Sequence, residues 1–417
     1  MRILMVSEDA PYAAMGGLAK HALNLARALV RAGHVVDFLG GAQHPIKIAG
    51  AEGEFGGRFI GALSGHLAGW KERRLGIYIP YKRSWLAQRF ARIIAQYAEG
   101  YDVVHYHGHV PNLARHLPTS INFIQTRHDQ GSDCLQHTRF RNGTVCTSID
   151  PADCAGCIAT NPNFVQRAIS AVAVRRFRRE VAESFQRHQT VFVSDMLRRN
   201  FCRTMGEQAW GTVIHHFVDS ELLGQAASHP LRLPDAAPIE ILVAGKIYPP
   251  KGIDQFISLF SHRHLSGCRL LVVGDGPELA TLQTQFSSPQ VRFLGWQDPL
   301  KTLRLTAGAD AIVVPSVCEE AFGSTTLEGL LLGKTTFALA RGGTPELACY
   351  AAGPEQLRLH GELTELVNDL ACFLHPACQP PPLLDGTGST ARAIEQLLPL
   401  YRRQHAAAFT EREATCP

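Results

Sequence analysis

The stretch that decides the fold runs from Ala309 to Leu332 and reads ADAIVVPSVCEEAFGSTTLEGLLL. Its first part, residues 309–315, is apolar and β-branched and ends in proline, which predicts a short buried strand. Residues 327–332 predict a helix, and the Ser-Thr-Thr sequence at 324–326 supplies candidates for its N-cap. The order strand, loop, helix is typical of an open α/β sheet, in which ligands bind beside the carboxyl ends of the strands.

Two carboxylates stand in this stretch, Glu320 in the loop and Glu328 about one turn into the predicted helix. Carboxylate oxygens accept hydrogen bonds from hydroxyl groups, and the free N–H groups at a helix start favour a phosphate. Two hydroxyl-rich groups on either side of a phosphate describe a nucleotide sugar. The alternative is an ordinary strand-to-helix loop with acidic side chains on its surface.

The segment resembles the Glu-x7-Glu signature of family-4 retaining glycosyltransferases. It shares Phe322 and Gly323 after the first glutamate and the later Gly-Gly-x-Pro-Glu sequence at residues 342–346. The resemblance implies the GT-B fold, an α/β architecture of two doubly wound Rossmann-like domains facing a central cleft. It also implies a retaining hexosyltransferase that moves a sugar from a nucleotide-diphosphate sugar, of UDP or GDP type, to an acceptor hydroxyl. Bacterial surface polysaccharide or glycolipid assembly is the setting that the resemblance favours, with a saccharide or a lipid-linked saccharide as acceptor.

Residues that match the family motifs take roles by this resemblance. Glu328 would hold the ribose of the donor, and Glu320 would hold the transferred sugar. The backbone that assists Glu320 belongs to Phe322, Gly323 and Ser324.

The resemblance also implies the catalytic residues, which are Glu320, His128 and Lys251. His128 follows a predicted strand at the place where the family has a histidine that meets the donor sugar. Retention would proceed by attack on the same face of the sugar, with the leaving phosphate taking the acceptor proton.

A second loop, residues 245–252, carries two cations, Lys246 and Lys251. Two cations on one loop can neutralise a diphosphate, and a leaving nucleotide needs this stabilisation. The loop resembles the family's Gly-Arg-x4-Lys-Gly, but Lys246 replaces the arginine, so the charge is kept and the bidentate fork is lost. The sequence has no Asp-x-Asp triplet of the kind that metal-dependent glycosyltransferases use, which fits catalysis without a cofactor. The alternative is two solvated surface lysines.

The glycine pair Gly16-Gly17 lies between the first predicted strand and its helix. Glycine lets backbone N–H groups approach a ligand closely, and a helix start adds positive potential. The family has a similar loop near the donor diphosphate and the acceptor. The alternative is a plain tight turn.

The domain organisation follows from strand and helix patterns that repeat on both sides of an aperiodic segment. We expect an N-terminal domain at 1–222, a linker over 222–238, and a second domain at 239–388. The resemblance to the family implies that the first domain lies on the acceptor side and that the second binds the nucleotide sugar. By resemblance to the family, a final helix within 389–417 crosses back to the N-terminal domain.

Four of the 11 cysteines fall in an insertion at residues 129–160 of the N-terminal domain. They are Cys134, Cys146, Cys154 and Cys157. Their spacing, Cys-x11-Cys-x7-Cys-x2-Cys, could supply four thiolates to a structural zinc ion or an iron–sulfur cluster. The alternative is four reduced thiols.

An arginine-rich stretch contains Arg175, Arg176, Arg178 and Arg179 around Phe177. Such a stretch favours contact with an anionic membrane, and Phe177 could insert at the interface. The alternative is a solvated helix face tied to its own Glu180 and Glu183.

Composition excludes other classes. The chain has 417 residues, 45% of them hydrophobic, and a formal net charge of +4, as expected for two globular domains. No apolar run approaches the roughly 18 residues that span a bilayer, and the N-terminus does not read as a secretory signal. We therefore expect a cytoplasmic protein, or one peripheral on the inner face of the cell membrane. Nothing resembles a nucleic-acid-binding module.

Two rival functions stay open at this point. One is a nucleotide-sugar epimerase or phosphorylase of the same fold, which would consume the donor without an acceptor hydroxyl. The other is a catalytically silent GT-B subunit that binds a partner enzyme, which the lysine at position 246 favours.

Overall fold

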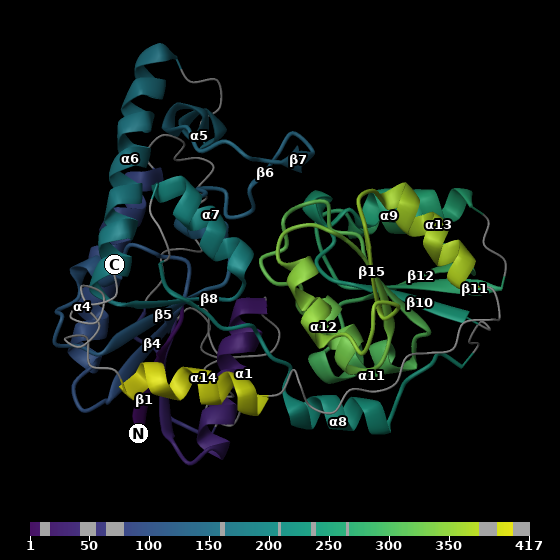
Figure 1. The fold of residues 1–417 in the computed structure, drawn as a ribbon, viewed down its shortest axis with the longest axis horizontal. Helices are drawn as coiled ribbons and strands as arrows, with labels where there is room; N and C mark the ends of the chain where they lie inside the picture. The colour runs from purple at the N-terminus through teal and green to yellow at the C-terminus, as the bar shows by residue number, and fades with distance from the viewer. Residues whose placement is uncertain are drawn as a thin grey trace, which may run out of the picture. The chain divides into compact units, whose positions relative to one another are not determined.

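The computed structural model describes residues 1–8, 17–41, 56–63, 79–158, 163–206, 210–234, 239–263, 267–374 and 390–402. The chain forms two compact α/β units, each built on its own parallel sheet (Figure 1). The first unit comprises Met1–Arg139, Cys146–His216 and the C-terminal residues from Ala393, and the second comprises Phe140–Val145 and Phe217–Arg392. The prediction of two doubly wound α/β domains is confirmed.

The sheet of the first unit has seven strands in the order β3-β2-β1-β4-β5-β8-β9. All of its neighbouring pairs are parallel. The chain moves outward from β1 in one direction and then returns to build the other half from β4, so the order reverses between β1 and β4. The strands are β1 (Arg2–Val6), β2 (Val35–Leu39), β3 (Phe59–Ile60), β4 (Val103–His107), β5 (Phe123–Arg127), β8 (Gln189–Phe192) and β9 (Thr212–Val213).

Helices cover this sheet because their apolar faces match the buried strands. One core cluster packs Phe90 and Ile94 of α4 against Leu4 and Val104 of the sheet, and all four are at most 1% exposed. The helices are α1 (Gly17–Arg31), α4 (Ile79–Tyr97), α5 (Pro151–Ile158), α6 (Phe164–Arg187), α7 (Asp195–Met205) and α14 (Thr390–Arg402). Shorter elements of this unit are the 3₁₀ turns η2 (Ala114–His116) and η3 (Gln130–Ser132). The hairpin β6 (Phe140–Arg141) with β7 (Thr144–Val145) lies between them and α5 in sequence and belongs to the second unit.

The C-terminal helix α14 belongs to the first unit from Ala393 onward. The Tyr401 hydroxyl lies 2.7 Å from Nδ1 of His105 in β4, and Asn122 donates its side-chain amide to the Tyr401 carbonyl at 2.7 Å. Gln189 donates to the Leu400 carbonyl at 2.9 Å. The helix was expected within 389–417, and residues 389 and 403–417 lie outside the described residues.

The second unit has a six-stranded sheet in the order β12-β11-β10-β13-β14-β15, again with parallel neighbours. Its order reverses between β10 and β13. The strands are β10 (Ile239–Ala244), β11 (Cys268–Val273), β12 (Val291–Gly295), β13 (Ala311–Val314), β14 (Thr335–Leu339) and β15 (Leu357–His360).

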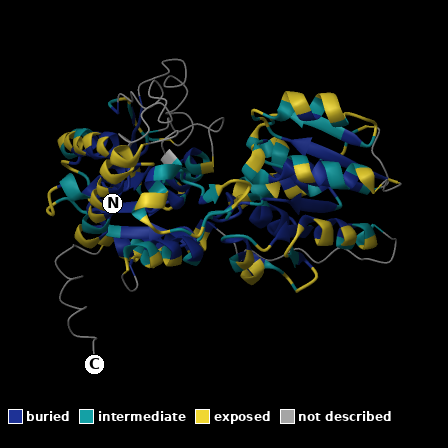
Figure 2. Ribbon diagram, turned by 90° about the horizontal axis from the view of Figure 1, so that it is seen from above, coloured by how far each residue is buried: buried dark blue, intermediate teal, exposed yellow. Residues whose placement is uncertain are grey.

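The helices of this unit bury one face each. Phe256 and Phe260 of α9 pack with Leu366 and Leu370 of α13 in the same core cluster. The helices are α8 (Ser220–Ser228), α9 (Ile253–His262), α10 (Leu279–Phe286), α11 (Pro299–Gly308), α12 (Ser324–Leu331) and α13 (Leu363–Phe373), with the 3₁₀ turns η4 (Pro249–Lys251) and η5 (Thr344–Tyr350). In each unit the central strands are mostly buried, and exposed residues lie on the helices and loops around them (Figure 2).

The predicted linker over 222–238 is wrong for its first part, which is the helix α8. The Asp219 side chain accepts from the backbone N–H groups of Glu221 and Leu222 at 3.0 and 3.4 Å and so starts the helix. Beyond it, the backbone of Leu231 donates to the carbonyl of Arg304 in α11 at 2.8 Å. Residues 220–234 are therefore an ordered part of the second unit, and 235–238 lie outside the described residues.

Within the part of the chain that the structure describes, no helix has both the length and the apolar character needed to cross a membrane.

Candidate functional site

The candidate site in the second unit lies where its strand order reverses. The loop after β10 carries Lys246 and Lys251, and the loop after β13 carries Glu320. Because β10 and β13 are adjacent parallel strands, both loops leave the carboxyl edge of the sheet at the same place. Open α/β sheets bind ligands at this topological switch point.

Helix α12 begins directly after the second loop. Its N-cap is Gly323, which has a left-handed φ of +93° and offers no side-chain cap. The N–H groups of the first turn, residues 324–326, have no acceptor within the helix, which makes this helix start suited to an anion. The prediction of Ser324, Thr325 or Thr326 as N-cap is wrong, because the helix starts earlier and these residues form its first turn.

Lys251 and Glu320 form an ion pair, and Ser316 donates its hydroxyl to the same carboxylate oxygen of Glu320. Both side chains are largely buried, with 27% of Lys251 and 13% of Glu320 exposed. Burial opposes the charged form of each group, but their mutual attraction outweighs it, so the pKa of Lys251 is raised and the pKa of Glu320 is lowered. The site therefore holds a fixed positive and a fixed negative charge at neutral pH.

Close backbone contacts fix the two loops. A Cβ on Gly252, which has φ +61°, would lie 2.4 Å from the carbonyl of Pro315. This glycine therefore lets the Lys251 loop approach the end of β13. Lys246 on the same loop is exposed, and its Nζ lies 5.2 Å from the centre of the Tyr248 ring.

The glycines of the Gly-Gly-x-Pro-Glu sequence gain a physical role that sequence reasoning missed. The backbone N–H of Gly343 donates to the Glu320 carbonyl at 2.7 Å. A Cβ on Gly342, with φ +62°, would lie 2.4 Å from that same carbonyl oxygen. The motif thus holds the backbone on which Glu320 stands. Of the other predicted residues, Phe322 and Glu328 are buried at 2% and 6% exposure in this same segment.

The first unit brings His128 into a cluster of histidines. Nε2 of His128 lies 2.9 Å from Nδ1 of His107, and Nδ1 of His128 lies 2.8 Å from Nε2 of His216. His21 of α1 stacks on His216 with ring centres 4.2 Å apart. His105 lies beside His107, with ring centres 4.0 Å apart. The cluster gathers at the carboxyl edge near β1 and β4, the switch point of this sheet.

These five histidines are neutral at pH 7. Burial lowers the pKa of His21 and of His105 to about 3. Burial, and then the charges of the neighbouring rings, lower the pKa of His107, His128 and His216 well below the ordinary value. A neutral imidazole has one donor and one acceptor nitrogen, so His128 gives one hydrogen bond and receives the other within the cluster. His216, for which no role was expected, is one of its two partners.

The glycine pair is only partly described. Gly17 is the exposed first residue of α1, and Gly16 lies outside the described residues.

None of the four cysteines of the insertion forms a disulfide in the structure. They do not form a group of three or more whose sulfur atoms all lie within 4.8 Å of one another, a statement that covers only the described residues. Arg178 donates to the Cys154 sulfur at 3.2 Å, and Cys146 is close enough for its charge to affect the pKa of Cys154, which burial raises. Burial raises the pKa of Cys134 to about 11.

The arginine-rich stretch lies in α6, and the expectation that Phe177 could insert into a membrane is wrong. Phe177 is 1% exposed and belongs to the core, and Arg178 is 8% exposed and donates to the carbonyl of Ile149 at 2.6 Å. The exposed arginines are Arg175, Arg176 and Arg179. The alternative expectation paired these arginines with Glu180 and Glu183 of the same helix. One such bond is present, because Arg176 donates to Glu180 at 3.1 Å.

The first turns of α6 instead expose apolar side chains. Phe164 is 86% exposed, Val165 62%, Val172 60% and Ile169 46%. We call these four residues the α6 apolar stripe.

Comparison with protein-family models gives two matches. Residues 15–222 match the model described as glycosyltransferase family 4, and residues 238–370 match the model described as glycosyl transferases group 1. The gap between the two matches covers residues 223–237, and it begins inside α8.

Individual relatives agree with these matches. A glycogen synthase of Mycobacterium tuberculosis is 26% identical over 380 residues, which cover 83% of this chain and 80% of that protein. Among solved structures, the sucrose-phosphate synthase of Thermosynechococcus elongatus superposes with a TM-score of 0.63 at 19% identity, over 98% of this chain and 100% of that one. Anabaena Alr3699/HepE, solved in complex with UDP and glucose, gives a TM-score of 0.57 at 16% identity, over 99% of both chains.

Proposed function

The chain is a glycosyltransferase of the GT-B type, and from this premise we propose that it is a retaining hexosyltransferase. It moves a sugar from a nucleotide-diphosphate sugar to a hydroxyl of a saccharide or lipid-linked saccharide, in bacterial surface polysaccharide or glycolipid assembly. The observation that carries the proposal is the convergence of the Lys251–Glu320 pair and the start of α12 at one switch point.

The residues of this site suit the separate parts of the donor. Lys251, Lys246 and the N–H groups at the start of α12 stabilise the negative charge that develops on the leaving diphosphate. Glu320 is held anionic and accepts hydrogen bonds from the hydroxyls of the transferred sugar, and Glu328 takes the ribose. In the reaction the bond between the anomeric carbon and the phosphate oxygen breaks, and a bond from that carbon to the acceptor oxygen forms on the same face. The acceptor proton passes to the leaving phosphate.

The experiment that tests the proposal is a panel of donors with the full-length protein. UDP-glucose, UDP-galactose, GDP-mannose and ADP-glucose are each incubated with a p-nitrophenyl α-glucoside acceptor and with water alone. Release of the nucleotide is measured together with the anomeric configuration of the product. Retained configuration is expected, and an inverted product would contradict the mechanism.

The same panel separates the two rival functions. An epimerase or phosphorylase consumes the donor at a rate independent of the acceptor hydroxyl. A silent subunit gives no turnover and, in calorimetry, no binding of UDP or GDP. UDP-glucose is tested first because Alr3699/HepE was solved with UDP and with UDP-glucose.

We also propose that the cysteine insertion holds a structural zinc ion or iron–sulfur cluster. Binding would draw the four thiols together and displace their protons, and the guanidinium of Arg178 beside Cys154 favours the thiolate. Cys154 and Cys157 are close in sequence on α5, so both can reach one ion.

For this site we expect about one metal equivalent, or one cluster, in protein purified without chelator. Serine at Cys154 or at Cys157 is expected to abolish it, because each removes one of four ligands. Metal analysis and the visible absorption spectrum measure the content. A serine at the exposed Cys349, outside the insertion, is the control that retains the metal. Freshly reduced protein without metal would leave four ordinary thiols.

The acceptor proposal extends to the membrane surface, where a lipid-linked saccharide is found. The α6 apolar stripe precedes Arg175, Arg176 and Arg179 along the same helix, and all seven side chains are exposed. Apolar side chains that enter the interface beside cations that attract anionic lipid are typical of a peripheral contact on the cytoplasmic leaflet.

We therefore expect salt-sensitive binding to vesicles that contain phosphatidylglycerol. Glutamine at the three exposed arginines is expected to weaken binding roughly 100-fold, from about 1 kcal/mol per arginine. Serine at the four positions of the stripe is expected to weaken it and to leave the salt dependence unchanged. Sedimentation at low and high salt measures both effects. The control replaces three exposed arginines of other helices, Arg31, Arg92 and Arg199, by glutamine; wild-type protein that stays in the supernatant at low salt would contradict the proposal.

A further inference from the structure

A buried serine, Ser316, stands beside the ion pair of the proposed donor site, two positions after the end of β13. Its hydroxyl donates to Oε1 of Glu320, the same oxygen that pairs with Nζ of Lys251. The Glu320 carboxylate therefore receives two donors on one oxygen. One donor comes from its own loop and the other from the loop after β10.

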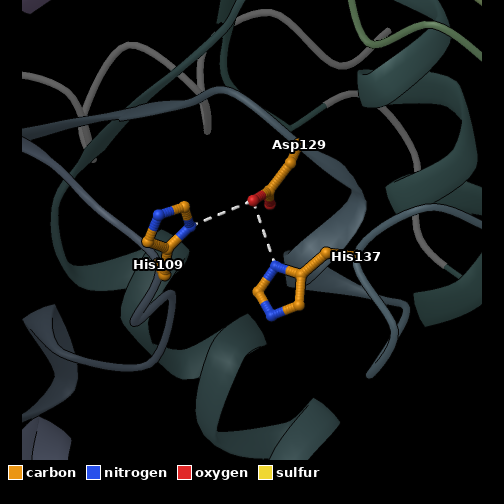
Figure 3. A group of neighbouring side chains, drawn as sticks. All are labelled: His109, Asp129 and His137. Atoms are coloured by element: carbon orange, nitrogen blue, oxygen red, sulfur yellow. Dashed lines mark hydrogen bonds and ion pairs between the residues drawn. The ribbon is translucent and has the colours of Figure 1, made fainter. Parts of the chain in front are cut away.

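The buried carboxylate of Asp129 in the first unit is satisfied differently (Figure 3). Its Oδ2 lies 3.2 Å from Nδ1 of His109 and 3.0 Å from Nδ1 of His137. Its Oδ1 accepts from the backbone N–H of Gly131 at 2.7 Å. Asp129 thus uses both of its oxygens for contacts within the protein.

Glu180 of α6 follows the pattern of Asp129. Its Oε2 accepts from the Ser84 hydroxyl, and Arg176 donates to its Oε1 at 3.1 Å. An ionised carboxylate offers about four acceptor positions, spread over its two oxygens. In Glu320, by contrast, both donors from the described residues go to Oε1. The acceptor positions that remain on Glu320 are therefore those of Oε2.

The two donors on Oε1 differ in stiffness. Lys251 carries its ammonium on a flexible four-carbon stem, so it can follow the carboxylate as it turns. Ser316 has a single side-chain torsion and stands on a fixed backbone, because the next two residues, Val317 and Cys318, both donate their N–H groups to the Pro250 carbonyl at 3.1 Å. The serine hydroxyl therefore sets the position of Oε1, and with it the direction in which Oε2 points.

The same hydroxyl helps to keep the carboxylate charged. Burial would raise the pKa of Glu320, but the charge of Lys251 and the hydrogen bonds from Lys251 and Ser316 lower it. An anionic oxygen accepts a stronger hydrogen bond from a hydroxyl than a neutral oxygen does. Ser316 thus acts on both the orientation and the charge of the group that faces the ligand.

We propose that Ser316 is a positioning residue, which holds Glu320 so that Oε2 alone accepts hydrogen bonds from the transferred sugar. One oxygen offers about two acceptor positions, so it fits a pyranose that turns one hydroxyl, or two adjacent hydroxyls, toward it. The inference rests on the proposed function. It adds to that function the residue that orients Glu320 and the oxygen that meets the sugar.

Ser316→Ala removes the hydroxyl and leaves the ion pair in place. We expect kcat/KM for UDP-glucose to fall roughly 10- to 100-fold, as for the loss of a hydrogen bond to a charged group. The Kd of UDP, measured by calorimetry, and the KM for p-nitrophenyl α-glucoside are expected to stay within about threefold of wild type, because neither ligand contains the transferred sugar. A loss of UDP binding as large as the loss of kcat/KM would mean a distorted loop and would overturn the proposal.

Ser84→Ala is the matched control, because Ser84 is also buried and also donates to a buried glutamate, Glu180. It removes the same kind of bond in the first unit. We expect its kcat/KM to stay within about threefold of wild type, although its free energy of unfolding falls. An equal loss of kcat/KM in both serine variants would contradict the positioning role, since lower stability would then explain both.

Two combinations test whether Ser316 acts through Glu320 and the sugar. In the Glu320→Ala background, Ser316→Ala should cause no further loss, and losses that multiply would contradict the proposal. The four monodeoxy analogues of UDP-glucose remove one ring or exocyclic hydroxyl each. With at least one of them, the difference between wild type and Ser316→Ala should become smaller. An unchanged difference with all four would show that Oε2 meets no sugar hydroxyl.

The outcomes separate this inference from the proposed function. If wild-type protein transfers sugar from none of the donors of the panel, the proposed function fails and the inference falls with it. If another donor of the panel is the one turned over, that donor and its deoxy analogues replace UDP-glucose. If wild type transfers sugar and Ser316→Ala keeps the wild-type kcat/KM, the inference alone is overturned.

Discussion

Alanine at Lys251 or at Glu320 is expected to lower turnover by about 10²-fold or more while the protein remains folded. Each residue supplies one preorganised charge to the proposed donor site, and removal of such a group costs a few kcal/mol of transition-state stabilisation. The two are also ion-paired with each other, so either change leaves the partner charge without its counterion. The double variant should therefore be little worse than the worse single variant. Steady-state kinetics with the donor found in the panel measure the effect, and circular dichroism checks the fold.

Matched controls for this prediction lie at the opposite, amino edge of the same sheet. Lys334 precedes β14 and is partly buried, and the exposed Glu355 precedes β15. Alanine at either position removes the same kind of charge and should leave turnover within about threefold of wild type. Near-normal rates in folded Lys251 and Glu320 variants would refute the assignment of the donor site.

Acidification from pH 7 to about pH 5 is expected to unfold the first unit. The five clustered histidines have folded-state pKa values lowered by burial, while the unfolded chain titrates near the ordinary value of about 6.5. Below that value the unfolded state binds more protons, so stability is present above pH 6.5 and is lost as the pH falls toward the folded pKa values. When unfolding takes up five protons, the free energy of unfolding falls by about 7 kcal/mol for each pH unit of acidification. The total free energy of unfolding of a domain is only about 5–15 kcal/mol.

Fluorescence of Trp210 reports on this transition, because its ring is 6% exposed and lies 6.5 Å from Phe201 in the first unit. Urea unfolding at a series of pH values gives the free energy of unfolding at each pH. The slope of this free energy against pH gives the number of protons taken up on unfolding. Glutamine at His216 removes one titrating ring and should lower the slope by about one proton. Glutamine at the exposed His262 of the second unit should leave it unchanged. An equal free energy of unfolding at pH 7 and pH 5 would be incompatible with a buried neutral cluster.

Much of the fold could be predicted because each strand is a short, continuous run of apolar residues in the sequence. The strand ending at Val314 and the helix after Phe322 were both expected from local pattern. The predicted start of a helix was less accurate where a glycine without a capping side chain stands at the N-cap, as Gly323 does in α12. The helix α8 was missed because only Ala226 of its residues is fully buried, so its sequence has little apolar period.

The placement of Glu320 and Gly323 in one loop was more predictable than the histidine cluster for a physical reason. Glu320 and Gly323 stand in one loop, and the structure places them as the motif suggests at the end of β13. The hydrogen bond between His128 and His216 joins residues 88 positions apart, and only the order of the sheet brings them together. No local pattern in the sequence predicts a contact between two residues so far apart in the chain.

The burial of Phe177 could have been predicted from the helical period, but the arginines around it made the stretch look exposed. It continues a helical series of buried positions at Ser170, Val174 and Val181. The four arginines around it drew attention to the exposed face of the helix. Periodicity was the better guide than composition at this position.

The bond between Tyr401 and His105 sets the order in which the two units can be completed on the ribosome. Roughly 180 residues, including the second unit, are translated between His216 and Ala393, which takes about 10–35 s at 5–20 residues per second. Throughout that interval β4 lacks the hydroxyl partner of His105, and Asn122 lacks the carbonyl that it meets in the finished molecule. A nascent chain arrested just before Ala393 therefore carries a nearly complete second unit and an incomplete first one, the reverse of the order in which they are synthesised.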